Sequence, residues 1–466
     1  MTATRWNRRT AALVAATLAS LLTAFTGSSI NIALPQVGQD FSMDAILLSW
    51  IPTSFLLAAA MFLVPIGRLA DIHGRKKVFT TGTAVFTLAS LVAGLAPSAI
   101  ALIAARALQG IGSAMISGTG IAILTSVFPA NERGRVLGIN VAAVYLGLSI
   151  GPPLGGILTQ QLGWRAIFFV TIPLGLVIIG FVLWLLDGEW AEAKGESFDL
   201  AGSGIYAVAL VALMYGFSQL PDLLGVALLV LGLAGFAVFA AWELRTNSPV
   251  LNLALFVGNR PFTFSNLAAL IHYSAVYAVT FLLSLYLQYI KALTPQQAGL
   301  VLIFQPVVQF IFSPAAGRLS DRVEPRILAS IGMILTSTGL LLLVFIGQDT
   351  PLWTIIGILI LLGFGYAIFS SPNMNAIMGA VDRRSYGVAS GMLATMRLIG
   401  QMLSMGIATL LFALFLGRAE ITPDLYPQFL TSAKAAFAVF TVLCVLGVFA
   451  SLARGDIRNN EQRKAA

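Results

Sequence analysis

Runs of about 20 predominantly apolar residues recur from one end of this chain to the other. That is the length a helix needs to cross the hydrocarbon core of a bilayer. Charged residues make up only 10% of the 466 residues, and hydrophobic residues make up 58%. A soluble domain carries roughly a quarter charged residues. The chain is therefore predicted to be an all-α integral membrane protein.

Windows of hydropathy predict fourteen membrane-spanning helices. They cover roughly residues 11–33, 44–66, 77–97, 99–127, 136–160, 165–186, 200–219, 223–243, 262–288, 297–317, 327–347, 352–379, 386–416 and 432–453. The first run is long enough to span and has no convincing cleavage site after it. We expect it to be a retained helix rather than a signal peptide.

The net charge of +8 reflects membrane topology. Most Lys and Arg fall in alternate loops and at both termini, which is the positive-inside pattern. It places both termini in the cytoplasm and predicts a multi-pass protein of the cell inner (plasma) membrane. The segment 187–199 is acidic although it counts as cytoplasmic, but carboxylates contribute little to orientation. No nucleic-acid partner is expected.

A short charged stretch, residues 67–77, separates two apolar runs and is repeated 250 positions later at 317–326. Gly, Arg, Leu and Asp match at equal offsets, and Arg326 falls opposite Lys76. We call residues 67–77 the charged island. A second set of glycines repeats at an offset of 253: Gly134, Gly138 and Gly147 match Gly387, Gly391 and Gly400.

These echoes predict two parallel six-helix halves with an inserted helix pair, a 6+2+6 arrangement. The expected boundaries are 1–190 for the N-terminal half, 191–260 for the inserted helices 7 and 8 with their linkers, and 261–466 for the C-terminal half.

Three motifs in this order resemble the major facilitator superfamily, and specifically its fourteen-spanner drug:proton antiporter branch. They are the charged island, the segment 106–112 (Arg-Ala-Leu-Gln-Gly-Ile-Gly) and the segment 147–156 (Gly-Leu-Ser-Ile-Gly-Pro-Pro-Leu-Gly-Gly). Residues 31–35 and the pair Trp164-Arg165 fit the same branch. The resemblance implies a major-facilitator-type fold and export of lipophilic small molecules (drug efflux, antibiotic resistance) by alternating access and proton antiport.

The resemblance also implies that the charged island and its echo form a cytoplasmic gate. The expected gate residues are Gly67, Asp71, Gly74, Arg75, Lys76, Gly317, Asp321 and Arg326. A topogenic loop would need only the basic residues, so the Gly and Asp spacing favours a gate. The seam that the family associates with exporters would contain Gly147, Gly151, Pro152, Gly155 and Gly156. Three of these glycines recur every four residues and share one helix face, which allows a neighbouring helix to approach closely.

The sequence departs from this branch at its usual acidic residue. Five positions before Asn31 stands Thr26. Within the predicted spans the only carboxylate is Glu243, at the very end of helix 8. His272 falls near the middle of helix 9 and could carry a proton instead, although a neutral, hydrogen-bonded histidine fits equally well.

Arg106 lies on the order of 10 Å into helix 4, where a guanidinium is costly unless it faces a cavity or a partner. Arg397 lies deep in helix 13. Two such arginines without an intramembrane carboxylate fit neutral or anionic lipophilic substrates better than cations. The predicted proton path or substrate site comprises Arg106, Gln109, His272, Asn31, Arg397, Gln401, Gln305 and Gln309.

No phosphate-binding loop is present, so nucleotide hydrolysis does not drive transport directly. With one cysteine and two histidines there is no metal-ligand cluster, and no nucleophile–base set indicates an enzyme. We expect no cofactor and a monomer whose partners are a small lipophilic substrate, protons and the bilayer. The open alternatives are a uniporter or exporter of a specific metabolite or lipid-like compound, and a non-transporting membrane sensor or scaffold.

Overall fold

The computed structural model describes residues 2–129, 132–186, 188–246, 249–251, 253–382 and 386–455. Within these ranges, fourteen helices are long and apolar enough to cross a membrane, which confirms the predicted number. The helix bounds of the first half are α1 (Thr2–Phe41), α2 (Ala45–His73), α3 (Arg75–Gly94), α4 (Ala99–Val127), α5 (Arg133–Leu162), α6 (Ala166–Phe169) and α7 (Thr171–Leu185).

The inserted pair consists of α8 (Leu200–Gln219) and α9 (Leu223–Glu243), and the 3₁₀ turn η1 (Leu253–Phe256) follows it. The second half contains α10 (Arg260–Leu285), the π-helical turn η2 (Tyr286–Ile290), α11 (Pro295–Leu302), α12 (Phe304–Ser320), α13 (Pro325–Val344), α14 (Leu352–Gly379), α15 (Tyr386–Phe415), the 3₁₀ turn η4 (Pro423–Leu425) and α16 (Tyr426–Ala453). Four spans are therefore built from two helical pieces: α6 with α7, α10 with η2, α11 with α12, and η4 with α16.

Local sequence signals explain where several helices begin. The Asp44 carboxylate accepts a hydrogen bond from the backbone N–H of Leu47 at 2.7 Å, and Ser98 accepts one from Ala101 at 3.3 Å. Thr294 and Gln297 form a reciprocal capping box at the start of α11. Such side-chain acceptors satisfy N–H groups that have no partner within the helix.

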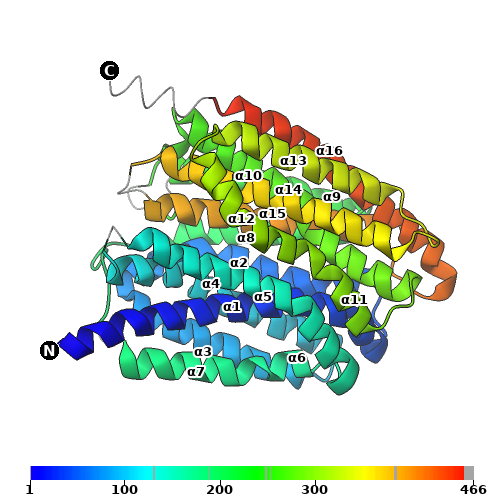
Figure 1. The fold of residues 1–466 in the computed structure, drawn as a ribbon, viewed down its shortest axis with the longest axis horizontal. Helices are drawn as coiled ribbons and strands as arrows, with labels where there is room; N and C mark the ends of the chain where they lie inside the picture. Colours follow the sequence, from blue (N-terminus) through cyan, green and yellow to red (C-terminus); the bar gives the residue numbers. More distant parts are fainter. Residues whose placement is uncertain are drawn as a thin grey trace.

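The helix packing repeats between the halves. In the first half α1 packs against α5, and α4 packs against both α2 and α3; in the second half α10 packs against α15, and α14 packs against both α12 and α13. The two halves form two layers in Figure 1, with the first half (blue to green) below the second (green to red). This is the parallel repeat that the sequence predicted.

Two contacts between the halves are equivalent, because each joins the fifth membrane-spanning helix of one half to the second of the other. Helix α5 packs against α11, and α2 packs against α15. Helix α8 packs against α9 and also against α2 and α15, so the inserted pair lies beside one of these two contacts. The beginning of α1 and the end of α16 lie at the same end of the molecule (Figure 1). We call this the terminus-bearing end.

The structure alters one expectation about local structure. The charged island is almost entirely helical, because α2 continues to His73 and α3 begins at Arg75. Only Gly74 lies between them, with a φ of 117° that a residue with a side chain rarely adopts. The island is therefore a sharp corner between two helices rather than a loop.

Candidate functional site

The central polar site is formed by side chains from both halves. Arg106 comes from α4 of the first half, whereas Tyr277 on α10 and Arg397 on α15 come from the second. The Tyr277 hydroxyl is close enough to both guanidinium groups to interact with them electrostatically. Tyr273 of α10 interacts electrostatically with Arg397 and with Tyr145 of α5. These five residues meet where the two repeats face each other.

Arg106 is almost completely buried, with 1% of its surface exposed, and several groups bind its guanidinium. Its Nη1 donates to Gln109 Oε1 at 2.7 Å, and its Nε donates to the Ile51 carbonyl at 3.4 Å. The guanidinium carbon lies 4.4 Å from the centre of the Phe55 ring, a cation–π contact. Gln109 in turn donates to Ser90 Oγ at 2.7 Å. All of these partners are uncharged.

Arg397 differs from Arg106 in its exposure. It is exposed although it lies near the middle of α15, and its guanidinium carbon is 5.9 Å from the centre of the Tyr273 ring. The side chain therefore lies beside α10. Its electrostatic interaction with Tyr277 puts it close to the central site.

His272 borders this site, because its ring centre lies 5.7 Å from that of Tyr273, but most of its contacts lie within the second half. Its ring stacks on Phe369 of α14 with the ring centres 4.0 Å apart, and it also contacts Tyr366 edge-on. It is 2% exposed, and its Nδ1 has no hydrogen-bond partner among the described residues. The structure places it inside the second half, and its role as a proton carrier stays a prediction.

The remaining predicted site residues occupy different environments. Gln305 donates to Gln309 along α12 at 3.4 Å, and both are half-buried, as is Gln401 on α15. Asn31 is buried, and its carbonyl accepts a hydrogen bond from Ser284 Oγ at 2.7 Å. This bond joins α1 to α10, so Asn31 lies at a contact between the halves. Thr26 is buried, and its hydroxyl donates to the Leu22 carbonyl at 2.8 Å.

The glycine seam of α5 serves two neighbours. A Cβ at Gly147 would lie 2.7 Å from the Leu21 carbonyl oxygen, and one at Gly155 would lie 3.0 Å from Ser29 Cα, so this face holds α1 of the same half. Gly151 likewise lies against Ser28 and Phe25 of α1.

The other side of the seam meets the opposite half. A Cβ at Gly156 would lie 3.0 Å from Gln296 Cα, and a Cβ at Gly299 would lie 3.0 Å from Pro153 Cα. Added side chains would also run into the carbonyl groups of Pro295 and Pro152. Here the backbones of α5 and α11 touch directly. Sequence reasoning missed Gly299 as the partner in this contact.

Polar contacts join the halves in the same region. Ser49 and Thr409 share a hydrogen bond of 2.8 Å between α2 and α15. Gln160 accepts a hydrogen bond of 3.3 Å from the backbone N–H of Gln296. Ser49 lies near the start of α2, and Gln160 lies near the end of α5. Because α1 begins at the terminus-bearing end, these contacts lie toward the opposite end of the molecule.

The charged island is bound by the acidic segment that follows its own half. Arg75 donates to Asp71 Oδ1 at 2.7 Å, and it donates to both carboxylate oxygens of Glu192, at 2.7 and 3.0 Å. It also donates to Ser126 Oγ at 2.7 Å. Arg68 pairs with Glu196. We call residues 188–199 the acidic strap.

Glu189 of the acidic strap caps helix α3. Its carboxylate accepts hydrogen bonds from the backbone N–H groups of Lys76 at 2.7 Å and of Lys77 at 3.1 Å. A carboxylate at a helix N-terminus is favoured by the unpaired N–H groups and by the helix dipole. Gly74 leaves the space that this carboxylate occupies. The sequence showed that this segment is acidic but gave no sign that it binds the island.

The echo of the island is built differently. Gly317 lies in α12, Asp321 follows the end of this helix, and Arg326 lies in the first turn of α13. Asn375 of α14 donates to Ser320 Oγ at 2.5 Å. At the position of Gly74 stands Glu324, with an ordinary φ of −54°.

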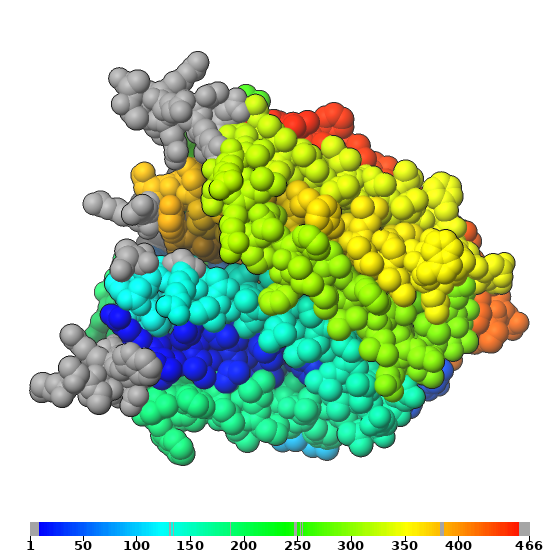
Figure 2. All heavy atoms as spheres, in the orientation of Figure 1, coloured from blue at the N-terminus to red at the C-terminus, as the bar shows by residue number. Residues whose placement is uncertain are grey.

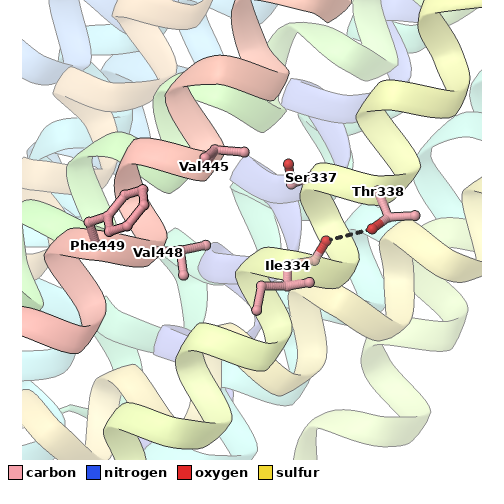
Figure 3. A pocket seen from close by; sticks show the side chains of 6 residues that line it. All are labelled: Ile334, Ser337, Thr338, Val445, Val448 and Phe449. Carbon is pink, nitrogen blue, oxygen red and sulfur yellow. Dashed lines mark hydrogen bonds between the residues drawn. The ribbon is translucent and has the colours of Figure 1, made fainter.

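One further groove lies on the surface of the second half, away from these sites. Ile334, Ser337 and Thr338 of α13 face Val445, Val448 and Phe449 of α16 across it (Figure 3). Its lining is apolar apart from two hydroxyl groups, and the Thr338 hydroxyl already donates to the Ile334 carbonyl at 2.9 Å. It carries no charged group and does not resemble the central site.

Comparison with known proteins identifies relatives of this chain. The profile of the Major Facilitator Superfamily matches residues 16–253 and 266–466. The riboflavin transporter RibZ of Clostridioides difficile (strain 630) is 29% identical over 85% of this chain and 86% of its own length. The cephamycin export protein CmcT of Amycolatopsis lactamdurans is 33% identical over 86% of this chain and 84% of its own length.

A solved structure has the same fold. It is a bacterial homologue of the human lysosomal transporter Spinster in an inward-facing, unoccupied conformation. It covers 96% of this chain and 97% of its own, with a TM-score of 0.67 and 18% sequence identity.

Proposed function

This chain belongs to the Major Facilitator Superfamily, and on that premise we propose that it is a secondary active exporter of lipophilic small molecules. The observation that carries the proposal is the central polar site, to which each half contributes one arginine and at least one tyrosine. Transporters of this architecture bind their substrates near the midplane, between the two repeats. A site shared by the halves can change its access when one half rocks against the other.

Closure of one end supports alternating access as the mechanism. The polar contacts between the halves, Ser49 with Thr409 and Gln160 with Gln296, lie away from the terminus-bearing end. In Figure 2 the first half (blue to green) and the second half (green to red) are in close contact at the end opposite the termini. With cytoplasmic termini in the plasma membrane, as the charge pattern predicts, this state would load substrate from inside.

We place the inner gate at the charged island and its echo. Arg75 and Asp71 are held by the acidic strap in this state, so the island is already ordered before the inner end closes. The echo, residues 317–326 from the end of α12 to the start of α13, lies on the half that would approach the charged island. The strap thus stabilises the corner at Gly74 and presents a rigid surface to the opposite half.

Proton antiport, which the family resemblance implies, stays a prediction. The membrane-spanning helices contain four carboxylates, Asp40, Asp71, Glu243 and Asp424, and each lies within about two residues of a helix end. The match to a riboflavin transporter favours a second candidate function, transport of one specific metabolite.

Efflux of a panel of lipophilic compounds from cells that express the protein tests the proposal. We expect export of some compounds and its loss in Arg106→Ala, while Arg418→Ala, which removes an exposed arginine outside the spans, serves as the matched control. Absence of export for the whole panel contradicts the proposed function. In proteoliposomes, flux that is indifferent to an imposed pH gradient contradicts proton coupling but leaves export standing.

A further inference from the structure

Among the residues that the structure describes, neither arginine of the central site has a carboxylate partner. Arg106 is bound by Gln109, by the Ile51 carbonyl and by the face of Phe55, none of which is charged. Arg397 faces Tyr273 and Tyr277. A guanidinium group stays protonated under physiological conditions, so both charges persist at this depth.

Three of the four carboxylates in the described spans have other partners near helix ends. Asp40 accepts hydrogen bonds from Trp164 at 2.7 Å and from Arg165 at 3.2 Å. Asp71 pairs with Arg75, and Glu243 accepts a hydrogen bond from the backbone N–H of Leu251 at 3.0 Å. None of these three is free to neutralise a charge at the membrane centre.

Both cations interact with Tyr277, so they lie close enough to repel each other, and the charge of the buried Arg106 is costly. An anionic ligand would offset both costs through charge-assisted hydrogen bonds. The Tyr277 hydroxyl interacts electrostatically with both guanidinium groups and can donate to an anion. The neighbouring rings of Tyr273 and Tyr145 offer apolar surface to the rest of the ligand.

We propose that the substrate is an amphipathic organic anion whose charged group binds between Arg106 and Arg397 and accepts a hydrogen bond from Tyr277. This inference rests on the proposed function and narrows its substrate class. The anion attracts a guanidinium on each half, so its binding favours the approach of the two halves at the centre. Without an anion, repulsion between the two like charges opposes that approach.

An anionic substrate also changes what must drive export. Outward movement of a monoanion is favoured by an inside-negative membrane potential, and 100 mV sustains an outward concentration gradient of about 50-fold. Export of this kind needs no carboxylate at the membrane centre. This agrees with the position of all four described span carboxylates near helix ends.

Three probes with the same aromatic body test the charge preference: pyrenylbutyl sulfonate, pyrenylbutanol and pyrenylbutyl trimethylammonium. The two ionic probes keep their charge at every working pH. We expect equilibrium dialysis with the purified full-length protein to show that the sulfonate binds at least about tenfold more tightly than the ammonium compound, the difference typical of one charge-assisted hydrogen bond. Equal binding, or a preference for the ammonium compound, overturns the proposal.

Variants of Arg397 separate the anion site from a general loss of folding, because this side chain is exposed. Arg397→Gln should weaken sulfonate binding about tenfold and leave ammonium binding within about twofold, whereas Arg397→Lys should restore most of the sulfonate affinity. Arg418→Gln is the matched control outside the spans. A sulfonate preference that survives Arg397→Gln contradicts the assignment of this residue.

Proteoliposomes test the drive. A potassium diffusion potential that is negative inside should accelerate efflux of the sulfonate. A potential of the opposite sign should slow this efflux, and neither potential should affect pyrenylbutanol. Sulfonate flux that ignores the potential overturns electrogenic export. If all three probes bind and are transported to the same extent, the anion site is refuted while export stands. If none of the three binds or is transported, the result counts against the proposed function itself.

Discussion

The two halves of this protein share their helix packing but differ in their polar chemistry. Each half pairs its helices in the same pattern, α1 with α5 and α4 with α2 and α3 in the first, α10 with α15 and α14 with α12 and α13 in the second. Yet the arginine of the first half is buried at the α2–α4 interface, whereas that of the second half is exposed at the centre.

The same contrast appears at the two repeated corners. The first is a one-residue break at Gly74, clamped by the acidic strap. The second, between Ser320 and Pro325, is longer and carries Glu324 at the matching position. Repetition of apolar and small residues preserves backbone packing, while isolated polar residues are free to diverge because each interacts only with its immediate neighbours.

The largest effect is expected where the halves touch. Gly156→Leu places a side chain in the backbone contact with α11 and should prevent the closed end from forming. Overpacking of this kind costs about 1–3 kcal/mol. We expect at least a tenfold loss of transport with the protein still folded, measured as initial efflux rate beside thermal unfolding in detergent. Gly138→Ala is the control on the same helix, because a Cβ there meets nothing within 4 Å; equal losses in both variants would contradict a role for this contact.

The next effect separates the two arginines. Arg106→Lys removes the fork that bonds Gln109 and the Ile51 carbonyl, and it should reduce transport about tenfold. Arg397→Lys keeps the charge at an exposed position and should reduce transport no more than about threefold. The measurement is the ratio of the two efflux rates at equal expression. Equal sensitivity would mean that burial does not distinguish the two residues.

A smaller effect is expected at the corners. Gly74→Ala forces a side chain into a positive φ and against Glu189, which should destabilise the first half by about 1–2 kcal/mol. Gly317→Ala in the echo has no such conflict, because a Cβ there meets only Ser371 Cβ at 3.8 Å, and its free energy of unfolding should change by less than about 0.5 kcal/mol. Thermal unfolding in detergent provides the comparison. The asymmetry would be refuted if both variants unfolded at the wild-type temperature.

The smallest effect is expected at His272. His272→Phe keeps the stacking on Phe369 and removes the Nδ1 atom that has no partner among the described residues. If the ring serves packing, efflux and its dependence on pH should remain within about twofold of the wild type. Loss of pH-dependent efflux with unchanged folding would instead make His272 part of a proton path.

The candidate site could be anticipated only in part. Arg106 and Gln109 follow from a motif, and their contact follows from spacing along one helix. Arg397 could be named because it is a charge in an apolar run. Its convergence with Arg106 on Tyr277 could not be read from the sequence, because tyrosines in membrane helices are common and nothing marks which face each presents. The role of Glu189 and Glu192 was missed for a similar reason, since a run of acidic residues usually indicates only a solvated segment.

The sequence by itself determined the fourteen spans, the parallel repeat and the family. Apolar runs of bilayer length and repeated small residues are local patterns, and a lipid environment leaves few alternatives to helices that satisfy their own backbone. The tertiary structure decided the rest: that Gly156 and Gly299 join the halves, that the acidic strap clamps the charged island, and that two arginines face one tyrosine. These depend on distances between helices far apart in the chain, which are set by the packing of whole helix faces rather than by any single stretch.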